Sequence, residues 1–196
     1  MLKTNPRKIV GNWAEGYALD AQVVSSSFVG YDEFGHPRFD TTRSELGEHL
    51  YKLKYGNERA AVGPIVETVA GFIASWKIPV DMIVPVPPSN LKRSFQPLLE
   101  LARALGAHIG IPVCEDCLVK VKETPQLKNV QDFPTRAKIL ESAFTVSSEK
   151  TRRKNVLVFD DLYQSGATLN AIVGILNSAG LVANVYVLAV TRAGKT

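Results

Sequence analysis

The sequence predicts an α/β fold in which a mainly parallel sheet carries helices on both faces, with a small N-terminal lobe beside it. Two observations predict this. After residue 78, short apolar segments alternate with amphipathic helical ones, which is typical of right-handed strand–helix–strand units. One segment, Val156–Phe159, is apolar on both faces, as a central parallel strand should be. We expect an N-terminal arm over residues 1–16, the small lobe over 17–77 and the core over 78–196.

The lobe is expected to hold a hairpin followed by two helices. Thr42 and Glu45 fit the T-x-x-E pattern of a capping box, and leucines at helical spacing follow. In chain order we expect a strand Gln22–Tyr31, a turn Glu33–Pro37, a return strand Arg38–Thr41, a helix ending at Gly56 and a helix Pro64–Trp76.

The core is expected to alternate strands and helices. The expected strands are Met82–Val86, Cys117–Val121, Val156–Phe159 and Val185–Val190. The expected helices are Phe95–Leu105, which Ser94 can cap, and Thr168–Ala179, which Gly180 ends. Residues 122–143 are polar and irregular, so we expect a long loop there.

The composition is that of an ordinary globular chain. Of its 196 residues 45% are hydrophobic and 21% charged, which excludes disorder over most of the chain. No apolar run approaches the ~20 residues of a membrane helix, and the first residues lack the apolar core of a secretory signal. We therefore expect a cytoplasmic protein without a membrane segment.

The excess positive charge is concentrated in the middle of the chain. Residues 92–154 hold 12 Lys and Arg against 7 Asp and Glu, whereas the rest of the chain holds 11 and 12. Such a surplus is most often a solvated face. Next to a cleft, it would attract phosphates, nucleotides or nucleic acid.

The segment Val156–Leu169, VLVFDDLYQSGATL, carries the chemistry. Its apolar strand ends in Asp160 and Asp161, and a short loop with Gly166 leads to a helix that begins at about Thr168. Ligands of open α/β sheets bind beyond the carboxyl ends of the strands, and a helix N-terminus binds anions. The carboxylates can accept hydrogen bonds from a diol, and the loop beside them can bind a phosphate. Together they indicate a phosphorylated sugar as the ligand. Both acids reach one diol only if the strand bends, because neighbours in a regular strand face opposite ways.

Other interpretations of these patterns fit less well. The acid pair could cap the following helix, or bind Mg²⁺ as in a response-regulator receiver, but receivers carry their acid pair after the first strand. Cys114 and Cys117 form a CxxC, yet no second pair accompanies them, so a metal or redox site is not indicated. The end Gly194–Thr196 imitates part of a Walker A motif but has no helix after it.

The acid-pair segment resembles the phosphoribosyl pyrophosphate (PRPP) signature of type I phosphoribosyltransferases, with Gln164 and Ser165 where two Thr are usual. Three further segments resemble the ComF family, which is amidophosphoribosyltransferase-like and associated with competence. They are Leu53–Ala61 (LKYGNERAA), Ile83–Leu105 (IVPVPPSNLKRSFQPLLELARAL) and Thr124–Phe144. The resemblance runs from about residue 50 to the end, and the four-cysteine zinc ribbon of many members is absent from the sequence.

This resemblance implies a type I phosphoribosyltransferase fold, with the lobe as its hood. It also implies a Mg²⁺-dependent glycosyltransferase reaction in which a nitrogenous acceptor displaces pyrophosphate from PRPP. Asp160 and Asp161 would hold the ribose hydroxyls, and Mg²⁺ would be held by PRPP itself, with either acid reaching it through water. The 5′-phosphate loop would be Gln164, Ser165, Gly166, Ala167 and Thr168. The pyrophosphate loop would be Pro87, Pro88, Ser89, Lys92 and Arg93, with Pro87–Pro88 a candidate non-trans bond. The catalytic cations of a closing loop would be Lys120, Lys122 and Arg136.

Three functions stay open at this point. The first is a phosphoribosyltransferase. The second is a non-catalytic protein that senses PRPP or a nucleotide monophosphate with the same pocket, in regulation or DNA uptake. The third is a partner of nucleic acid or DNA-processing proteins. The sequence does not identify the acceptor, and it does not decide whether the protein forms a homodimer.

Overall fold

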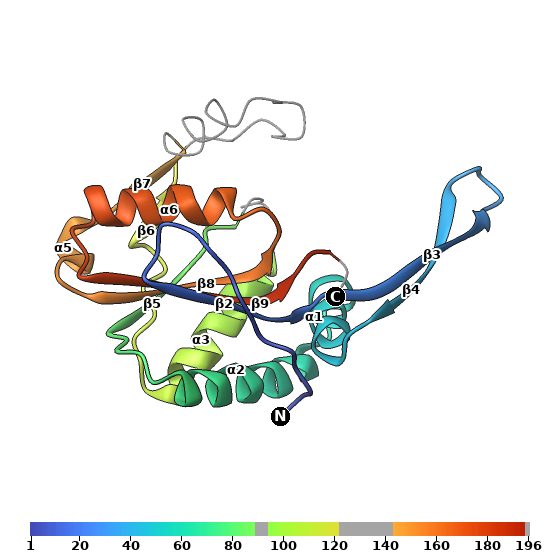
Figure 1. Ribbon diagram of the computed structural model, residues 1–196, viewed down its shortest axis with the longest axis horizontal. Coiled ribbons are helices and arrows are strands. Elements are labelled where there is room, and N and C mark those ends of the chain that lie inside the picture. The colour runs from blue at the N-terminus through green and yellow to red at the C-terminus, as the bar shows by residue number, and fades with distance from the viewer. Residues whose placement is uncertain (89–93, 122–142, 195–196) are drawn as a thin grey trace.

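A five-stranded sheet forms the centre of the computed structural model, which describes residues 1–88, 94–121 and 143–194 (Figure 1). Its strands are, in spatial order, β1 (Arg7–Lys8), β2 (Glu15–Ala21), β9 (Asn184–Arg192), β8 (Asn155–Tyr163) and β5 (Met82–Pro85). The short β1 runs antiparallel to β2, and every other neighbouring pair is parallel. The sheet is therefore mainly parallel, as the sequence predicts.

Helices cover both faces of this sheet (Figure 1). Helix α6 (Ala167–Ser178) lies on one face, and α2 (Val62–Trp76) and α3 (Pro97–Ile109) lie on the other. Side chains of β8 alternate between the two cores: Val156 and Val158 pack on the α6 side, whereas Leu157 and Phe159 pack on the α2–α3 side. This alternation follows from the period of two in a strand. The predicted α/β fold class is confirmed.

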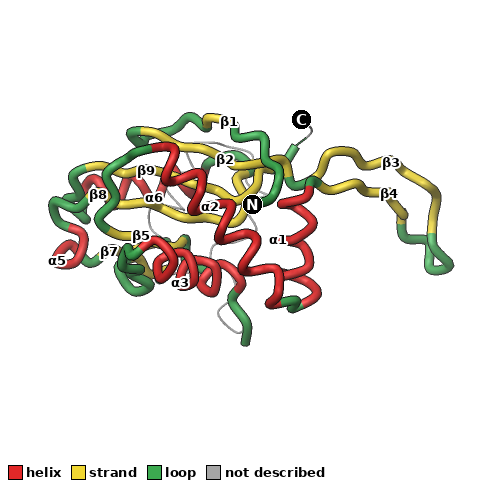
Figure 2. The backbone as a smooth tube through the Cα atoms, turned by 90° about the horizontal axis from the view of Figure 1, so that it is seen from below, coloured by secondary structure: helices red, strands yellow, loops and turns green. Residues whose placement is uncertain are grey.

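The remaining elements surround the sheet. They are the hairpin β3 (Val23–Tyr31) and β4 (Pro37–Arg43), α1 (Glu45–Gly56), the 3₁₀ turn η1 (Arg59–Ala61), the two-stranded sheet of β6 (Leu118–Lys120) and β7 (Phe144–Val146), and α5 (Ser148–Thr151). The hairpin extends away from the body, and α1 stands between it and the sheet (Figure 2). Within the three described ranges, no helix is both long and apolar enough to cross a membrane.

Strand β2 was not among the predicted elements. The sequence EGYALDA was divided between the expected arm and the lobe, yet β2 lies inside the central sheet, where Gly16 pairs with Val187 of β9. Ala18 and Leu19 are fully buried. No apolar alternation marks this strand, because Gly16 and Asp20 interrupt it. The division of the chain at residue 77 stays a prediction. The central sheet nevertheless includes β2, which precedes that residue in the chain.

Strand β6 forms where a strand was expected but pairs differently. It runs antiparallel to β7 in a separate two-stranded sheet, instead of extending the central one. Leu118 is buried and Val119 is 44% exposed. A strand that buries only one face suits an antiparallel ribbon lying on the core, whereas central parallel strands are buried on both faces.

The N-cap residues predicted for α1 and α3 are both wrong. The N-cap of α1 is Ser44, not Thr42: its hydroxyl accepts the backbone N–H of Gly47 at 3.0 Å and donates to the carbonyl of Ala21 at 2.6 Å. Helix α3 begins at Pro97 with Gln96 as N-cap and has no side-chain cap, so Ser94 lies outside it. Pro97 sets this start, because proline fits the first position of a helix but disrupts its interior.

Replacing Ser44 by Ala should destabilise the protein by about 1–2 kcal/mol, because both hydrogen bonds of the buried hydroxyl are lost at the α1 N-terminus. Thr42→Ala is the matched control, since Thr42 is exposed. We expect that control to stay within about 0.5 kcal/mol of the parent. Urea denaturation measures both; equal losses would contradict the assignment of the cap.

Candidate functional site

At the carboxyl end of β8, the adjacent acids Asp160 and Asp161 lie on opposite faces of the sheet. The strand stays paired with β9 to its last residue, with Asp160 opposite Ala189 and Tyr163 opposite Arg192. Because the strand does not bend, Asp160 lies on the α6 side of the sheet and Asp161 on the α1 side. The structure therefore brings Asp160, but not Asp161, to the predicted phosphate loop.

A pocket of about 130 Å³ joins Asp160 to that loop. Its lining consists of Asp160, Leu162, Tyr163, Gln164, Ser165, Gly166, Ala167, Thr168 and Leu169. All five residues predicted for the 5′-phosphate loop are in this set. The pocket lies at the N-terminus of α6, where the first backbone N–H groups have no partner within the helix and the helix dipole favours an anion.

Gly166 is the N-cap of α6 and sets the shape of the loop. Its φ of 73° lies in the left-handed region, which most side chains avoid. A Cβ built at Gly166 would lie 3.1 Å from the ring of Tyr163 and 3.4 Å from the amide nitrogen of Asn170. The glycine is thus required both by its backbone conformation and by the space around it.

Asp160 is held in an environment that favours its neutral form. Burial and the neighbouring charge of Asp161 raise the pKa of Asp160 from 3.8 to about 7, although Lys54 and a hydrogen bond from the backbone N–H of Asp161, at 2.8 Å, oppose the change. A carboxyl group with such a raised pKa at the mouth of a pocket is typical of a functional site.

The raised pKa of Asp160 should make the stability of the ligand-free protein depend on pH. Between 3.8 and about 7 the folded protein retains a proton that the unfolded chain has lost. The contribution of Asp160 to stability should therefore be greatest below this window and be lost as the pH rises through it, by a few kcal/mol at most, on the order of 1.4 kcal/mol per pKa unit. Urea denaturation at pH 5 and pH 8 measures this fall, which Asp160→Asn should remove. A fall of the same size in the variant would contradict the assignment to Asp160.

Asp161 forms an ion pair with Lys54 of α1. The ammonium lies 2.9 Å from the carboxylate, and the two side chains are only 18% and 19% exposed. The hydroxyl of Thr191 donates to the backbone carbonyl of Asp161 at 3.0 Å. The sequence interpretation missed Lys54, although it lies in the LKYGNERAA segment that carries part of the ComF resemblance.

The expected pyrophosphate loop begins beside the acid pair. The backbone N–H of Val86 donates to the carbonyl of Phe159 at 2.9 Å, which puts Val86 opposite Asp160 in the neighbouring strand, with Pro87 directly after it. Pro87 and Pro88 are half-buried, and the bond between them is trans, so the non-trans prediction is wrong. Lys120 lies on β6 and does not line the pocket described above. The other predicted residues, Ser89, Lys92, Arg93, Lys122 and Arg136, lie outside the described residues.

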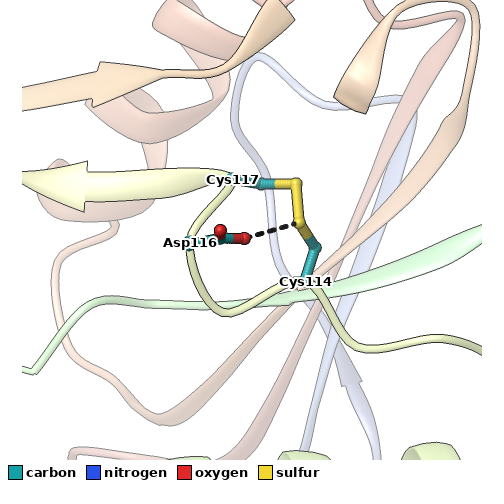
Figure 3. Close-up of side chains that lie close together, drawn as sticks. All are labelled: Cys114, Asp116 and Cys117. Atoms are coloured by element: carbon teal, nitrogen blue, oxygen red, sulfur yellow. Dashed lines mark hydrogen bonds between the residues drawn. A yellow bond between two sulfur atoms is a disulfide. The ribbon is translucent and has the colours of Figure 1, made fainter. Parts of the chain in front are cut away.

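Cys114 and Cys117 are joined by a disulfide, with their Cα atoms 5.4 Å apart (Figure 3). Asp116 lies between them in the chain, and its carboxylate is 3.4 Å from the sulfur of Cys114. Within the described residues these three form the one group whose spacing could hold a metal ion. The disulfide removes the thiolates that a metal requires, so the oxidised pair does not fit a metal site.

Comparison with solved structures identifies the fold. No protein family model and no curated protein matches the sequence. Adenine phosphoribosyltransferase from Trypanosoma brucei, solved with AMP, pyrophosphate and ribose 5-phosphate, matches with a TM-score of 0.51 at 10% identity, over 97% of this chain and 86% of that one. The same enzyme from Leishmania tarentolae matches with a TM-score of 0.49 at 10% identity, over 96% and 94%. The first match confirms the type I phosphoribosyltransferase fold, and identities this low carry nothing finer.

Proposed function

We propose that this protein binds PRPP through its ribose 5-phosphate part and transfers the phosphoribosyl group to, or from, a nitrogenous acceptor, with pyrophosphate as the leaving group. The observation that carries the proposal is the pocket in which Asp160 meets the loop Gln164–Thr168 at the N-terminus of α6. A carboxylate accepts hydrogen bonds from sugar hydroxyls, and the loop supplies donors for a phosphate.

The proposed roles follow from the chemistry of each group. Asp160 would hold the ribose diol, and the backbone N–H groups after Gly166 would hold the 5′-phosphate. The segment that follows Pro87 and Pro88 would receive pyrophosphate, because these two prolines come directly after Val86, which lies opposite Asp160 across the β5–β8 pair. The protein's contribution would be to position the substrates and to neutralise the charge that develops on the leaving group.

The proposed cofactor is Mg²⁺, brought by PRPP. Mg²⁺ prefers oxygen ligands and retains several waters, so it is usually bound by one or two carboxylates together with substrate phosphates. The half-buried carboxylate of Asp160, next to a phosphate loop, fits such a contact through water. When bound, the ion would neutralise pyrophosphate oxygens. The ion pair with Lys54 makes Asp161 the less suitable of the two acids.

A second function shares this pocket: sensing of PRPP or a nucleotide monophosphate without catalysis, as a ComF-like regulatory or competence protein. The ion pair between Asp161 and Lys54 favours it, because only one acid of the pair then faces the loop. The ComF resemblance, localisation in the cytoplasm, a homodimer, and contacts with nucleic acid or DNA-processing proteins stay predictions.

Release of pyrophosphate tests the proposal. The protein is incubated with PRPP and Mg²⁺ together with a panel of nitrogen bases, amines and nucleosides, and PRPP binding is measured by calorimetry in parallel. We expect binding of PRPP and acceptor-dependent release of pyrophosphate. Binding without release would favour the sensing function, and absence of binding would refute both.

A further inference from the structure

The disulfide between Cys114 and Cys117 lies on the connection between the central sheet and the two-stranded sheet of β6 and β7, which we call the β6–β7 ribbon (Figure 3). On one side, the backbone N–H of Cys114 donates to the carbonyl of Ile83 in β5 at 2.9 Å. On the other side, the carbonyl of Cys117 accepts the backbone N–H of Ser147, next to β7, at 2.9 Å. The disulfide therefore links a segment fixed to β5 with a segment fixed to the ribbon.

The two cysteines differ in their access to solvent. Cys114 is half-buried, whereas Cys117 is fully buried. A disulfide opens when a thiolate attacks one of its sulfur atoms, so the rate depends on which sulfur the thiolate can reach. Cys114 is the sulfur open to attack, and Cys117 is the leaving group. Exposed disulfides are also reduced more readily than buried ones.

The loop between the cysteines is held in place by contacts that do not involve sulfur. The guanidinium of Arg103 in α3 donates two hydrogen bonds to the carboxylate of Glu115, at 2.6 and 2.7 Å. The ammonium of Lys150 in α5 donates to the carboxylate of Asp116 at 2.5 Å. Together with the two backbone hydrogen bonds, these ion pairs keep the cysteine backbones at their positions when the disulfide is open. The two thiols then stay close together, and the disulfide can form again.

Stabilisation of the whole fold does not account for this disulfide. It closes a loop over a sequence separation of only three residues, and the stabilisation that a cross-link gives through loop closure is smallest for the shortest loops. The ribbon is also held by apolar packing, because Leu118 and Phe144 belong to the same buried core as Leu169 of α6. The disulfide thus adds a local link between the ribbon and β5 that can be opened without unfolding the protein.

We propose that Cys114 and Cys117 form a redox site that exchanges reversibly with small thiols, and that opening of their disulfide loosens the β6–β7 ribbon. The sequence pattern by itself did not indicate such a site. In the reaction, the thiolate of a small thiol forms a bond to the sulfur of Cys114, and Cys117 leaves with the electron pair of the broken S–S bond and takes up a proton. A second thiolate attacks the sulfur of the bound small thiol and releases Cys114, which is protonated in turn. Two small thiols are oxidised to one disulfide, and the protein disulfide is reduced to two thiols.

Counting of free thiols in the full chain tests the exchange. The chain has two cysteines, so alkylation followed by mass spectrometry distinguishes the disulfide from the dithiol directly. The folded protein is equilibrated with mixtures of reduced and oxidised glutathione at millimolar concentration, starting once from the disulfide and once from the dithiol. We expect both series to give the same transition between zero and two alkylated cysteines. A disulfide that opens only in urea, or a dithiol that does not close again, would overturn the proposal.

Two single-cysteine variants test which sulfur is attacked. Cys117→Ala leaves the half-buried Cys114, and Cys114→Ala leaves the buried Cys117, so each variant is the matched control of the other. With oxidised glutathione, Cys114 should form a mixed disulfide about tenfold faster than Cys117. Circular dichroism establishes that both variants are folded; the thiol count of the parent chain does not depend on them. Equal rates in two folded variants would contradict the assignment of Cys114 as the reactive sulfur.

Hydrogen exchange measures the effect on the ribbon. In the reduced protein we expect the backbone amides of β6 and β7 to exchange about tenfold faster than in the oxidised protein, whereas those of β8 and β9 should not change. The double variant Cys114→Ala, Cys117→Ala is the control, and should exchange at the faster rate in oxidising and reducing buffer alike. Equal exchange of β6 and β7 in the two redox states of the parent would refute the loosening of the ribbon.

Discussion

The double variant Asp160→Asn, Asp161→Asn is expected to stay folded and to bind ribose 5-phosphate between about 10- and 150-fold more weakly, because only Asp160 faces the loop. A hydrogen bond to a charged group contributes about 1.5–3 kcal/mol, which is roughly 10- to 150-fold for each acid that contacts the sugar. Stability should change little, because two effects oppose each other. Asp160→Asn removes a carboxyl group whose ionisation is unfavourable in the fold, and Asp161→Asn removes the ion pair with Lys54.

The two single variants distinguish the acids. Asp160 lines the pocket at the N-terminus of α6, so Asp160→Asn alone should account for most of the loss of affinity, whereas Asp161→Asn should mainly lower stability. Calorimetry with ribose 5-phosphate, without metal, isolates the sugar contacts. Asp40→Asn, an exposed acid on β4, is the control and should bind as the parent does. Unchanged affinity in the folded double variant would refute the sugar-phosphate site.

Gly166→Val should abolish binding of ribose 5-phosphate. The φ of 73° is unfavourable for a branched side chain, and the new Cβ would lie 3.1 Å from Tyr163, in the approach of the phosphate. We expect affinity to fall below detection in calorimetry, with a loss of stability of about 1–3 kcal/mol from backbone strain.

Gly110→Val is the matched control for this variant. Gly110 ends α3 with a φ of 70°, and a Cβ there meets no atom within 4 Å. It should therefore cost a similar amount of backbone strain and leave ribose 5-phosphate binding intact. Circular dichroism establishes that both variants are folded at the temperature of the binding experiment. If both variants bind alike, the loop around Gly166 does not hold the phosphate.

Local patterns of the sequence determined the central part of the fold and the loop of the candidate site. The apolar run Val156–Phe159 predicted β8, because a strand covered by helices on both faces must be apolar on both. The acids, glycine and hydroxyl residues that follow predicted a loop at the end of β8, and the residues of that loop line one pocket. That the loop holds a phosphate stays a prediction. The helices α1, α2, α3 and α6 were predicted to within a few residues at each end, since amphipathic spacing marks the interior of a helix better than its ends.

Tertiary structure alone decided which residues share a pocket. β2 belongs to the central sheet because β9 offers it a parallel edge, and nothing within EGYALDA indicates this partner. Asp160 and Asp161 are adjacent in sequence but face opposite cores, because β9 keeps β8 straight past both of them. Lys54 meets Asp161, and Arg7 and Arg192 line one cavity, across separations of about 100 residues or more. Contacts between distant segments depend on how helices and strands pack, and no local pattern of residues encodes them.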